Sequence, residues 1–200
     1  MKKYTQEEFD GFETDEFGYK VCPSGDYTNI KNFGEWCSFG KGCSFGEQCS
    51  FGESCRFGES CSFGEVCSFS KWCRFGEGCR FGGWCGFGEG CSFSERCSFG
   101  EGCRFDEGCR FGGWCGFGEG CSHEGLTNST YVAVDRIGSE ERKTYFFKAD
   151  EGYFVRAGCW FGTFDEFEKR VKEVHAGTVH EKTYLMALEL AKVMLDSEVE

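Results

Sequence analysis

The residues of this chain that could do chemistry are its three histidines and its 17 cysteines. His175 and His180 are five positions apart and Glu181 follows directly, so these side chains could supply two or three ligands of a metal site. The same positions fall where one expected helix ends and the next begins, and a histidine at a helix C-terminus interacts favourably with the helix dipole. We therefore interpret them as helix-terminal residues, with a metal site as the alternative.

Fifteen of the 17 cysteines recur every sixth residue from position 37 to position 121. Zinc sites normally use Cys-x-x-Cys spacing and loops that let four ligands converge, whereas disulfide scaffolds place cysteines irregularly in loops. The strict period instead predicts reduced cysteines that pack as small apolar residues, and no cofactor. The Cα atoms of cysteines stacked at strand spacing would lie at a separation found in disulfides. The geometry therefore also allows disulfides to form along a stack.

The cysteines belong to fifteen consecutive six-residue repeats that run from residue 33 to residue 122. Each of the first fourteen of these cysteines stands two positions before the Phe that opens the next repeat, so in an extended segment both point to the same side. Glycine follows Phe in twelve of the fifteen repeats, and we expect it to supply a turn with positive φ. Each repeat is therefore a short strand followed by a corner. The expected core of one side consists of Phe39, Cys43, Phe57, Cys61, Phe75, Cys79, Phe93, Cys97, Phe111 and Cys115.

The period of six also predicts how the strands are arranged. Three such sides make an eighteen-residue coil, which places each repeat on the repeat three units later at a spacing of about 4.8 Å. Fifteen repeats then give five coils, and a four-sided helix is the alternative.

This pattern resembles that of hexapeptide-repeat left-handed β-helix proteins, in which an aliphatic residue precedes a small or acidic residue and, four positions on, a second small residue. Phe39, Gly40 and Cys43 take these places in one repeat. The resemblance implies a mainly β fold, a triangular left-handed parallel β-helix. It also implies trimers, with acyl transfer by a catalytic histidine in many members.

That activity is not expected here, because residues 33–122 contain no histidine and no inserted loop. The same absence excludes the three-histidine zinc site that the related carbonic anhydrases carry. His123 directly follows the last repeat and could act as a base, but we expect it to be a solvated cap residue.

The flanking segments are the natural covers for the open ends of such a solenoid. We expect residues 1–32 to form an N-terminal cap, with a capping box at Thr5 and Glu8. Residues 123–200 should form an α+β module: strands at 131–137, 143–148 and 152–157 precede two helices, the first capped by Thr163 and Glu166 and the second at 180–195. This module resembles uncharacterised domains of phage and bacterial proteins with similar Cys-Phe repeats.

The chain is acidic throughout, with a formal charge of −12 in total. Such a surface repels nucleic-acid phosphate and anionic lipid head groups, so neither direct nucleic-acid binding nor membrane binding is expected. The chain begins with no apolar leader and has no eighteen-residue apolar run, which favours a cytoplasmic protein. A homo-oligomer, including a trimer, stays open.

The candidates for partner binding are four tryptophans that stand just before a cysteine of the repeat. They are Trp36, Trp72, Trp84 and Trp114. Trp is enriched at binding sites, but in an eighteen-residue frame Trp36 and Trp72 share one face two coils apart, Trp114 lies on the second face and Trp84 on the third, so we expect them to cover their own corners rather than form one patch. The sequence thus favours a non-enzymatic scaffold that binds a protein partner. Two alternatives are an acidic mimic of nucleic acid that inhibits a nucleic-acid-binding protein and a trimeric acyltransferase relative.

Overall fold

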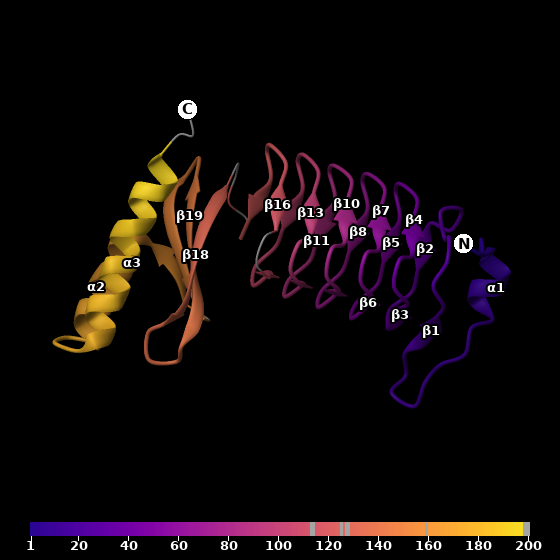
Figure 1. Ribbon diagram of the computed structural model, residues 1–200, viewed down its shortest axis with the longest axis horizontal. Coiled ribbons are helices and arrows are strands. Elements are labelled where there is room, and N and C mark those ends of the chain that lie inside the picture. Colours follow the sequence, from indigo (N-terminus) through magenta and orange to yellow (C-terminus); the bar gives the residue numbers. More distant parts are fainter. Residues whose placement is uncertain (113–114, 125, 127–128, 159, 198–200) are drawn as a thin grey trace. The chain divides into compact units, whose positions relative to one another are not determined.

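The computed structural model describes residues 1–112, 115–124, 126, 129–158 and 160–197 of the chain. The chain divides into two compact units, Met1–Gly125 and Leu126–Glu200. The first is a parallel β-solenoid and the second a small α+β unit, so the expected fold class is confirmed (Figure 1).

The solenoid has three parallel sheets, to which successive repeats contribute in turn. Sheet 1 contains β1 (Lys20–Cys22), β3 (Cys37–Phe39), β6 (Arg56–Phe57), β9 (Arg74–Phe75), β12 (Ser92–Phe93) and β15 (Arg110–Phe111). Sheet 2 contains β4 (Ser44–Phe45), β7 (Ser62–Phe63), β10 (Arg80–Phe81), β13 (Ser98–Phe99) and β16 (Gly116–Phe117). Sheet 3 contains β2 (Asn32–Phe33), β5 (Ser50–Phe51), β8 (Ser68–Phe69), β11 (Gly86–Phe87), β14 (Arg104–Phe105) and β17 (Ser122–His123).

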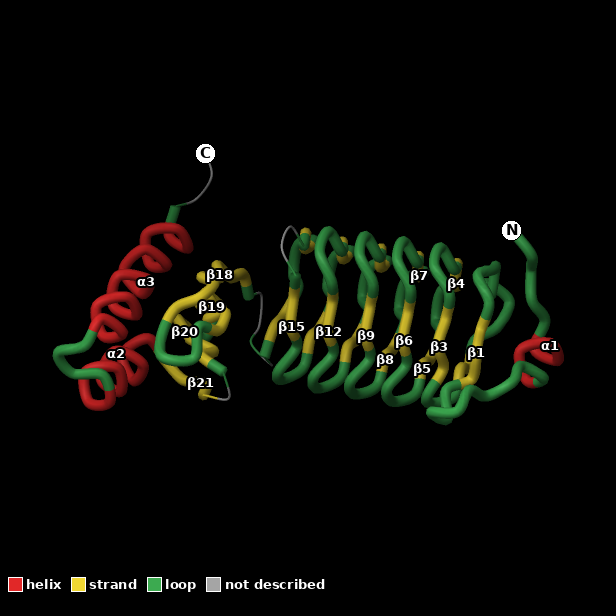
Figure 2. The backbone as a smooth tube through the Cα atoms, turned by 60° about the horizontal axis from the view of Figure 1, so that its bottom comes forward, coloured by secondary structure: helices red, strands yellow, loops and turns green. Residues whose placement is uncertain are grey.

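The pairing register shows that the coil has three sides. Ser38 pairs with Arg56 and Phe39 with Phe57, a shift of 18 residues. Figure 2 shows the coils stacked along the axis of the unit. A further coil precedes the repeats, because β1 pairs with β3 and Asp26 forms a parallel bridge with Ser44. The solenoid therefore has about six turns rather than five, and it begins inside the segment expected to be only a cap.

The core consists of three columns of phenylalanine rings. Within a column, rings of successive coils stack in parallel, as Phe57 and Phe75 do at a centroid distance of 4.9 Å. Rings of neighbouring columns meet edge to face, as Phe57 and Phe63 do at 5.0 Å and 86°. Both geometries are favourable for aromatic pairs, and each buried Phe contributes roughly 1.5–3 kcal/mol of transfer free energy. The expected core residues are buried, except that Cys115 is partly exposed.

The cysteines connect each coil to the one before it. The Cys55 thiol donates a hydrogen bond to the Gly34 carbonyl, 21 residues earlier, with a sulfur to oxygen distance of 3.3 Å. The same relation joins Cys79 to Gly58 at 3.4 Å and Cys97 to Gly76 at 3.4 Å. Cysteine therefore fills a small apolar place and also donates to a carbonyl of a corner in the preceding coil.

The glycine after Phe has a different role from the one expected. The positive φ lies two positions later, at the residue before Cys, and non-glycine residues such as Ser54 (58°) and Val66 (59°) adopt it there. Glycine is favoured after Phe because the coils approach closely at this point in most repeats. A Cβ at Gly64 would lie 2.5 Å from the Glu47 amide nitrogen and 2.7 Å from the Gly46 carbonyl carbon.

The N-terminal end of the core is covered by aromatic residues. Helix α1 (Gln6–Asp10) begins with the expected capping box of Thr5 and Glu8. It places the Phe9 ring edge-on to Phe33 at a centroid distance of 5.2 Å, and Tyr4 stacks on Tyr27 at 4.9 Å. The aromatic columns thus continue into the cap.

The C-terminal unit is an antiparallel meander covered by two helices. The strands are β18 (Thr130–Ile137), β19 (Arg142–Ala149), β20 (Gly152–Ala157) and β21 (Trp160–Thr163), in that order across the sheet. The helices are α2 (Phe164–Val174), which starts with the expected capping box at Thr163, and α3 (Val179–Asp196). Phe146, Val155, Phe167 and Leu188 lie in the core between them. The sequence did not predict β21, because this strand is short and runs directly into α2.

Candidate interaction surface on the solenoid

His123 is not the solvated residue that the sequence led us to expect. It pairs in register with Phe105 and takes the place that Phe holds in every repeat. Its ring stacks on Phe105 at a centroid distance of 5.0 Å and meets Phe117 edge-on at 4.8 Å, and only 2% of the residue is exposed. The Phe period therefore continues one step beyond residue 122, with His as the last ring. A base so enclosed could not reach a substrate on the surface.

The histidine pair in the C-terminal unit lies at the turn between α2 and α3, as expected. The ring centroids of His175 and His180 are 5.9 Å apart. The Glu181 carboxylate accepts a hydrogen bond from the Gly177 amide at 2.6 Å, so it serves the start of α3. Across the described ranges, no group of three or more His, Cys, Asp or Glu side chains could hold a metal ion.

The cysteine thiols of each column interact with one another, and their pKa values shift in both directions. The pKa of the Cys79 thiol is raised, first by the neighbouring Cys61 and Cys97 side chains of its column and then by burial. The Cys85 thiol has a raised pKa for the same reasons, with Cys103 and Cys67 as its neighbours. Hydrogen bonds from neighbouring thiols lower the pKa of Cys61 and Cys97 in the same column, so the structural interpretation of the cysteines depends on their burial and on their hydrogen bonds to backbone carbonyls.

The exposed tryptophans stand at corners, in the left-handed backbone region. The φ angles are 57° at Trp36, 59° at Trp72 and 61° at Trp84, whereas Trp114 lies outside the described residues. A bulky residue is unfavourable there, and glycine fills the same place in other repeats, for example at Gly42. The tryptophans are 43%, 52% and 62% exposed, so they bring strain without the full benefit of burial.

Each of two tryptophan rings lies over a glycine of the following coil. A Cβ at Gly90 would be 2.6 Å from Cδ1 of Trp72, and a Cβ at Gly102 would be 2.6 Å from Cε3 of Trp84. Trp36 differs, because its ring packs against Tyr19 at a centroid distance of 5.1 Å. The chain thus provides space for the rings of Trp72 and Trp84 along the corners.

The corners of Trp72 and Trp84 border the same sheet. Trp72 follows β8 and Trp84 precedes β11, and these strands are neighbours in sheet 3, with Ser68 paired to Gly86. The eighteen-residue repeat assigns the two tryptophans to different faces of the coil, but a residue at a corner borders both sheets that meet there. The outward residue of the next strand, β14, is Arg104, which pairs with Gly86. No atom lies within 4 Å of the Cβ position of Gly86, so the floor between the two corners is open.

The rest of these two corners is lined by glutamates, two positions after each Phe. On the Trp72 side they are Glu35, Glu53, Glu89 and Glu107, and on the Trp84 side they are Glu47, Glu65, Glu101 and Glu119. Both rows are interrupted next to the tryptophans, by Lys71 and by Gly83. Lys71 donates to Glu89 of the next coil at 2.9 Å. We call Ser68, Gly86, Arg104, Val66, Trp72 and Trp84 the Trp72–Trp84 surface.

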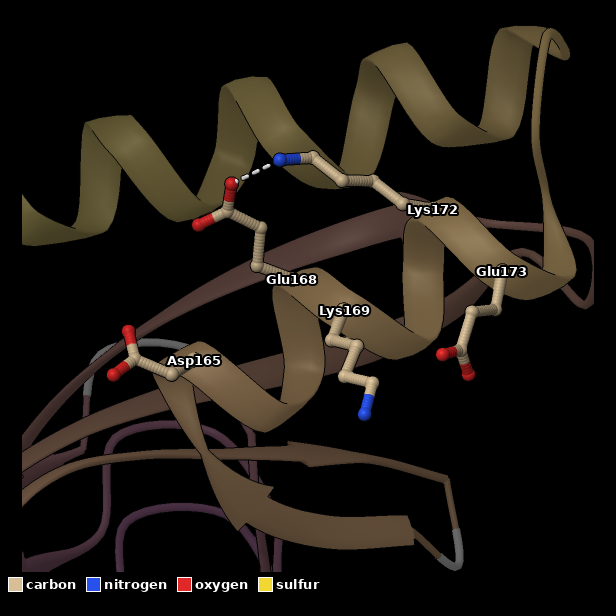
Figure 3. Close-up of a pocket in the computed structure, with 5 residues that line it drawn as sticks. All are labelled: Asp165, Glu168, Lys169, Lys172 and Glu173. Atoms are coloured by element: carbon tan, nitrogen blue, oxygen red, sulfur yellow. Dashed lines mark hydrogen bonds and ion pairs between the residues drawn. The ribbon is translucent and has the colours of Figure 1, made fainter.

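A shallow hollow in the C-terminal unit is a weaker candidate for a binding site than the Trp72–Trp84 surface. It follows the outer side of α2 and is lined by Asp165, Glu168, Lys169, Lys172 and Glu173 (Figure 3). Lys172 pairs with Glu168 at 2.5 Å. Mixed charges at helical spacing are typical of a solvated helix surface.

Comparison with known families gives one partial match. The model of an RNA-binding, Nab2-type zinc finger matches residues 36–52, 48–64, 72–94 and 109–122, which together make up less than half of the chain. The residues do not fit a CCCH zinc site, because residues 33–122 contain no histidine and the Cys79 and Cys97 thiols donate to backbone carbonyls inside the coil. No curated protein and no solved structure matches the chain.

Proposed function

We propose that this protein is a non-enzymatic β-helix scaffold that binds a basic, extended segment of a partner protein over the Trp72–Trp84 surface. The observation that carries the proposal is that two departures from the regular repeat occur together in adjacent coils. Two strained, exposed tryptophans border the same sheet, and both rows of glutamates are interrupted beside them. Strain retained at exposed positions is more typical of binding surfaces than of packing.

The charge of the surroundings indicates the chemistry of the partner. Lys71 and Arg104 are the cations of this region, and the rows of glutamates above and below them on both sides of sheet 3 favour cationic side chains. Lys or Arg over a Trp face contributes about 0.5–2 kcal/mol as its solvation decreases. The solenoid already contains such a contact, since the Arg56 guanidinium carbon lies 3.8 Å from the centre of the Tyr19 ring. The open floor at Gly86 leaves room for the backbone of an extended segment.

The environment proposed for this scaffold is the cytoplasm, where thiols stay reduced. The cysteines act as hydrogen-bond donors in the coil, and oxidation would remove the proton that they donate. Among the described residues, no helix has the length and apolar character needed to cross a bilayer.

The test is a titration of the full chain with a synthetic Arg/Lys-rich peptide and a Glu-rich peptide of equal length, followed by tryptophan fluorescence and calorimetry. We expect saturable binding of the basic peptide alone. The double variant W72G/W84G should weaken binding about fivefold or more, because two lost cation–π contacts of about 0.5–2 kcal/mol each total at least about 1 kcal/mol. Glycine is the residue that favours positive φ, so this variant should fold.

W36G is the matched control, since Trp36 has the same backbone conformation but packs on Tyr19. Equal loss of binding in W36G and W72G/W84G would reduce the interaction to general acidity and overturn the proposal. Saturable binding of single-stranded RNA, suggested by the partial zinc-finger match, would also overturn it.

A further inference from the structure

Helix α3 carries two apolar faces, of which its own unit uses one. Ala187, Leu188, Ala191 and Leu195 are buried against the core that also contains Phe146 and Phe167. α3 packs on β18, β19 and α2. The opposite face exposes a second apolar stripe made of Val179 (65%), Met186 (72%), Leu190 (53%), Val193 (69%) and Met194 (50%).

The spacing of this stripe is that of a helix-pairing seam. Val179, Thr183, Met186, Leu190 and Val193 follow one another at intervals of four, three, four and three residues. Apolar residues at alternating intervals of three and four align on one side of a helix and pack into the holes of a partner helix. The residues next to the seam on its outer side are Lys182 and Glu189, both exposed.

We propose that α3 pairs in an antiparallel manner with α3 of a second copy of this chain, with the two-fold axis at Met186. The stripe is self-complementary in that arrangement. Val179 then lies opposite Val193 of the other copy, and Thr183 lies opposite Leu190, because each pair is centred within one residue of Met186. A two-fold interface uses the same surface on both copies, so every such contact forms twice.

The charges support the same register. Lys182 and Glu189 are also centred within one residue of Met186, so antiparallel pairing sets the Lys182 ammonium of each copy beside the Glu189 carboxylate of the other. Parallel pairing would instead set each Lys182 beside the buried Ala187 position. Charge complementarity and apolar complementarity therefore select one partner, a second copy, and one orientation.

The test is sedimentation equilibrium of the full chain over a range of concentrations. We expect a reversible dimer, and we expect M186K to raise its dissociation constant at least tenfold, because it would place two like charges next to each other at the two-fold axis of an apolar seam. Met186 is mostly exposed, so M186K should keep the helical circular dichroism of the native chain. V21K, which changes an exposed valine of β1 in the solenoid, is the matched control and should leave the dimer intact.

A charge exchange tests the orientation. K182E and E189K should each weaken the dimer, and the double variant K182E/E189K should restore it, because both pairs re-form with reversed sign. A monomer at every concentration, a dimer indifferent to M186K, or a double variant weaker than both single variants would overturn the proposal. The result is independent of peptide binding to the solenoid.

Discussion

Replacing Gly64 by alanine should destabilise the solenoid, because its Cβ would enter the backbone of the preceding coil. The new atom would lie 2.5 Å from the Glu47 amide nitrogen and 2.7 Å from the Glu47 Cα, distances at which the two coils must separate. Ser70, Ser94 and Asp106 occupy the same place in other repeats, so a coil can widen locally, and the cost should resemble that of ordinary overpacking, about 1–3 kcal/mol. Alanine also restricts the unfolded chain, which returns about 0.4–1 kcal/mol.

The net loss is then centred on about 1.3 kcal/mol, within limits of about 0 and 2.6 kcal/mol, and the central value corresponds to a fall in melting temperature of about 3–5 °C for a chain of this size. The assay is thermal unfolding followed by near-UV circular dichroism of the aromatic columns. Gly86→Ala is the matched control, because nothing lies within 4 Å of its Cβ position, and its melting temperature should stay level or rise slightly. Equal melting temperatures for the two variants would refute the idea that close approach of the coils selects this glycine.

Three further predictions concern the last ring of the aromatic core, the thiols and zinc. His123→Phe completes the aromatic column above Phe105 and should raise the melting temperature. Among the described thiols more have a raised folded-state pKa, such as Cys79 and Cys85, than a lowered one, such as Cys61 and Cys97, so their net contribution to stability is lost as the pH rises above the unfolded-state pKa of about 8.5. The urea midpoint under reducing conditions should therefore fall between about pH 8 and pH 10, and a constant midpoint would contradict the assignment. Zinc chelators should leave the melting temperature unchanged, whereas a fall would restore the zinc-finger interpretation of residues 36–64, 72–94 and 109–122.

Much of the fold follows from the sequence because the repeat is local and strict. Cys and Phe two positions apart determine which side chains point inward, and a period of six lets three strands close into a coil. The capping boxes at Thr5 and Thr163 also depend only on residues three positions apart, and both formed as predicted. The second unit was predicted as strands followed by helices for the same reason, apart from the short β21.

The remaining features depend on contacts between residues far apart in the chain. The need for glycine at Gly64 comes from Glu47 in the coil before it, and the burial of His123 comes from its register with Phe105. Periodicity shows that a residue lies at a corner, but only the sheet pairing shows which sheets that corner borders. Sequence therefore determined the columns of Phe and Cys, whereas tertiary structure decided that Gly64 lies against Glu47 and that α3 exposes a second apolar face, because contacts between coils and between helices are set by packing.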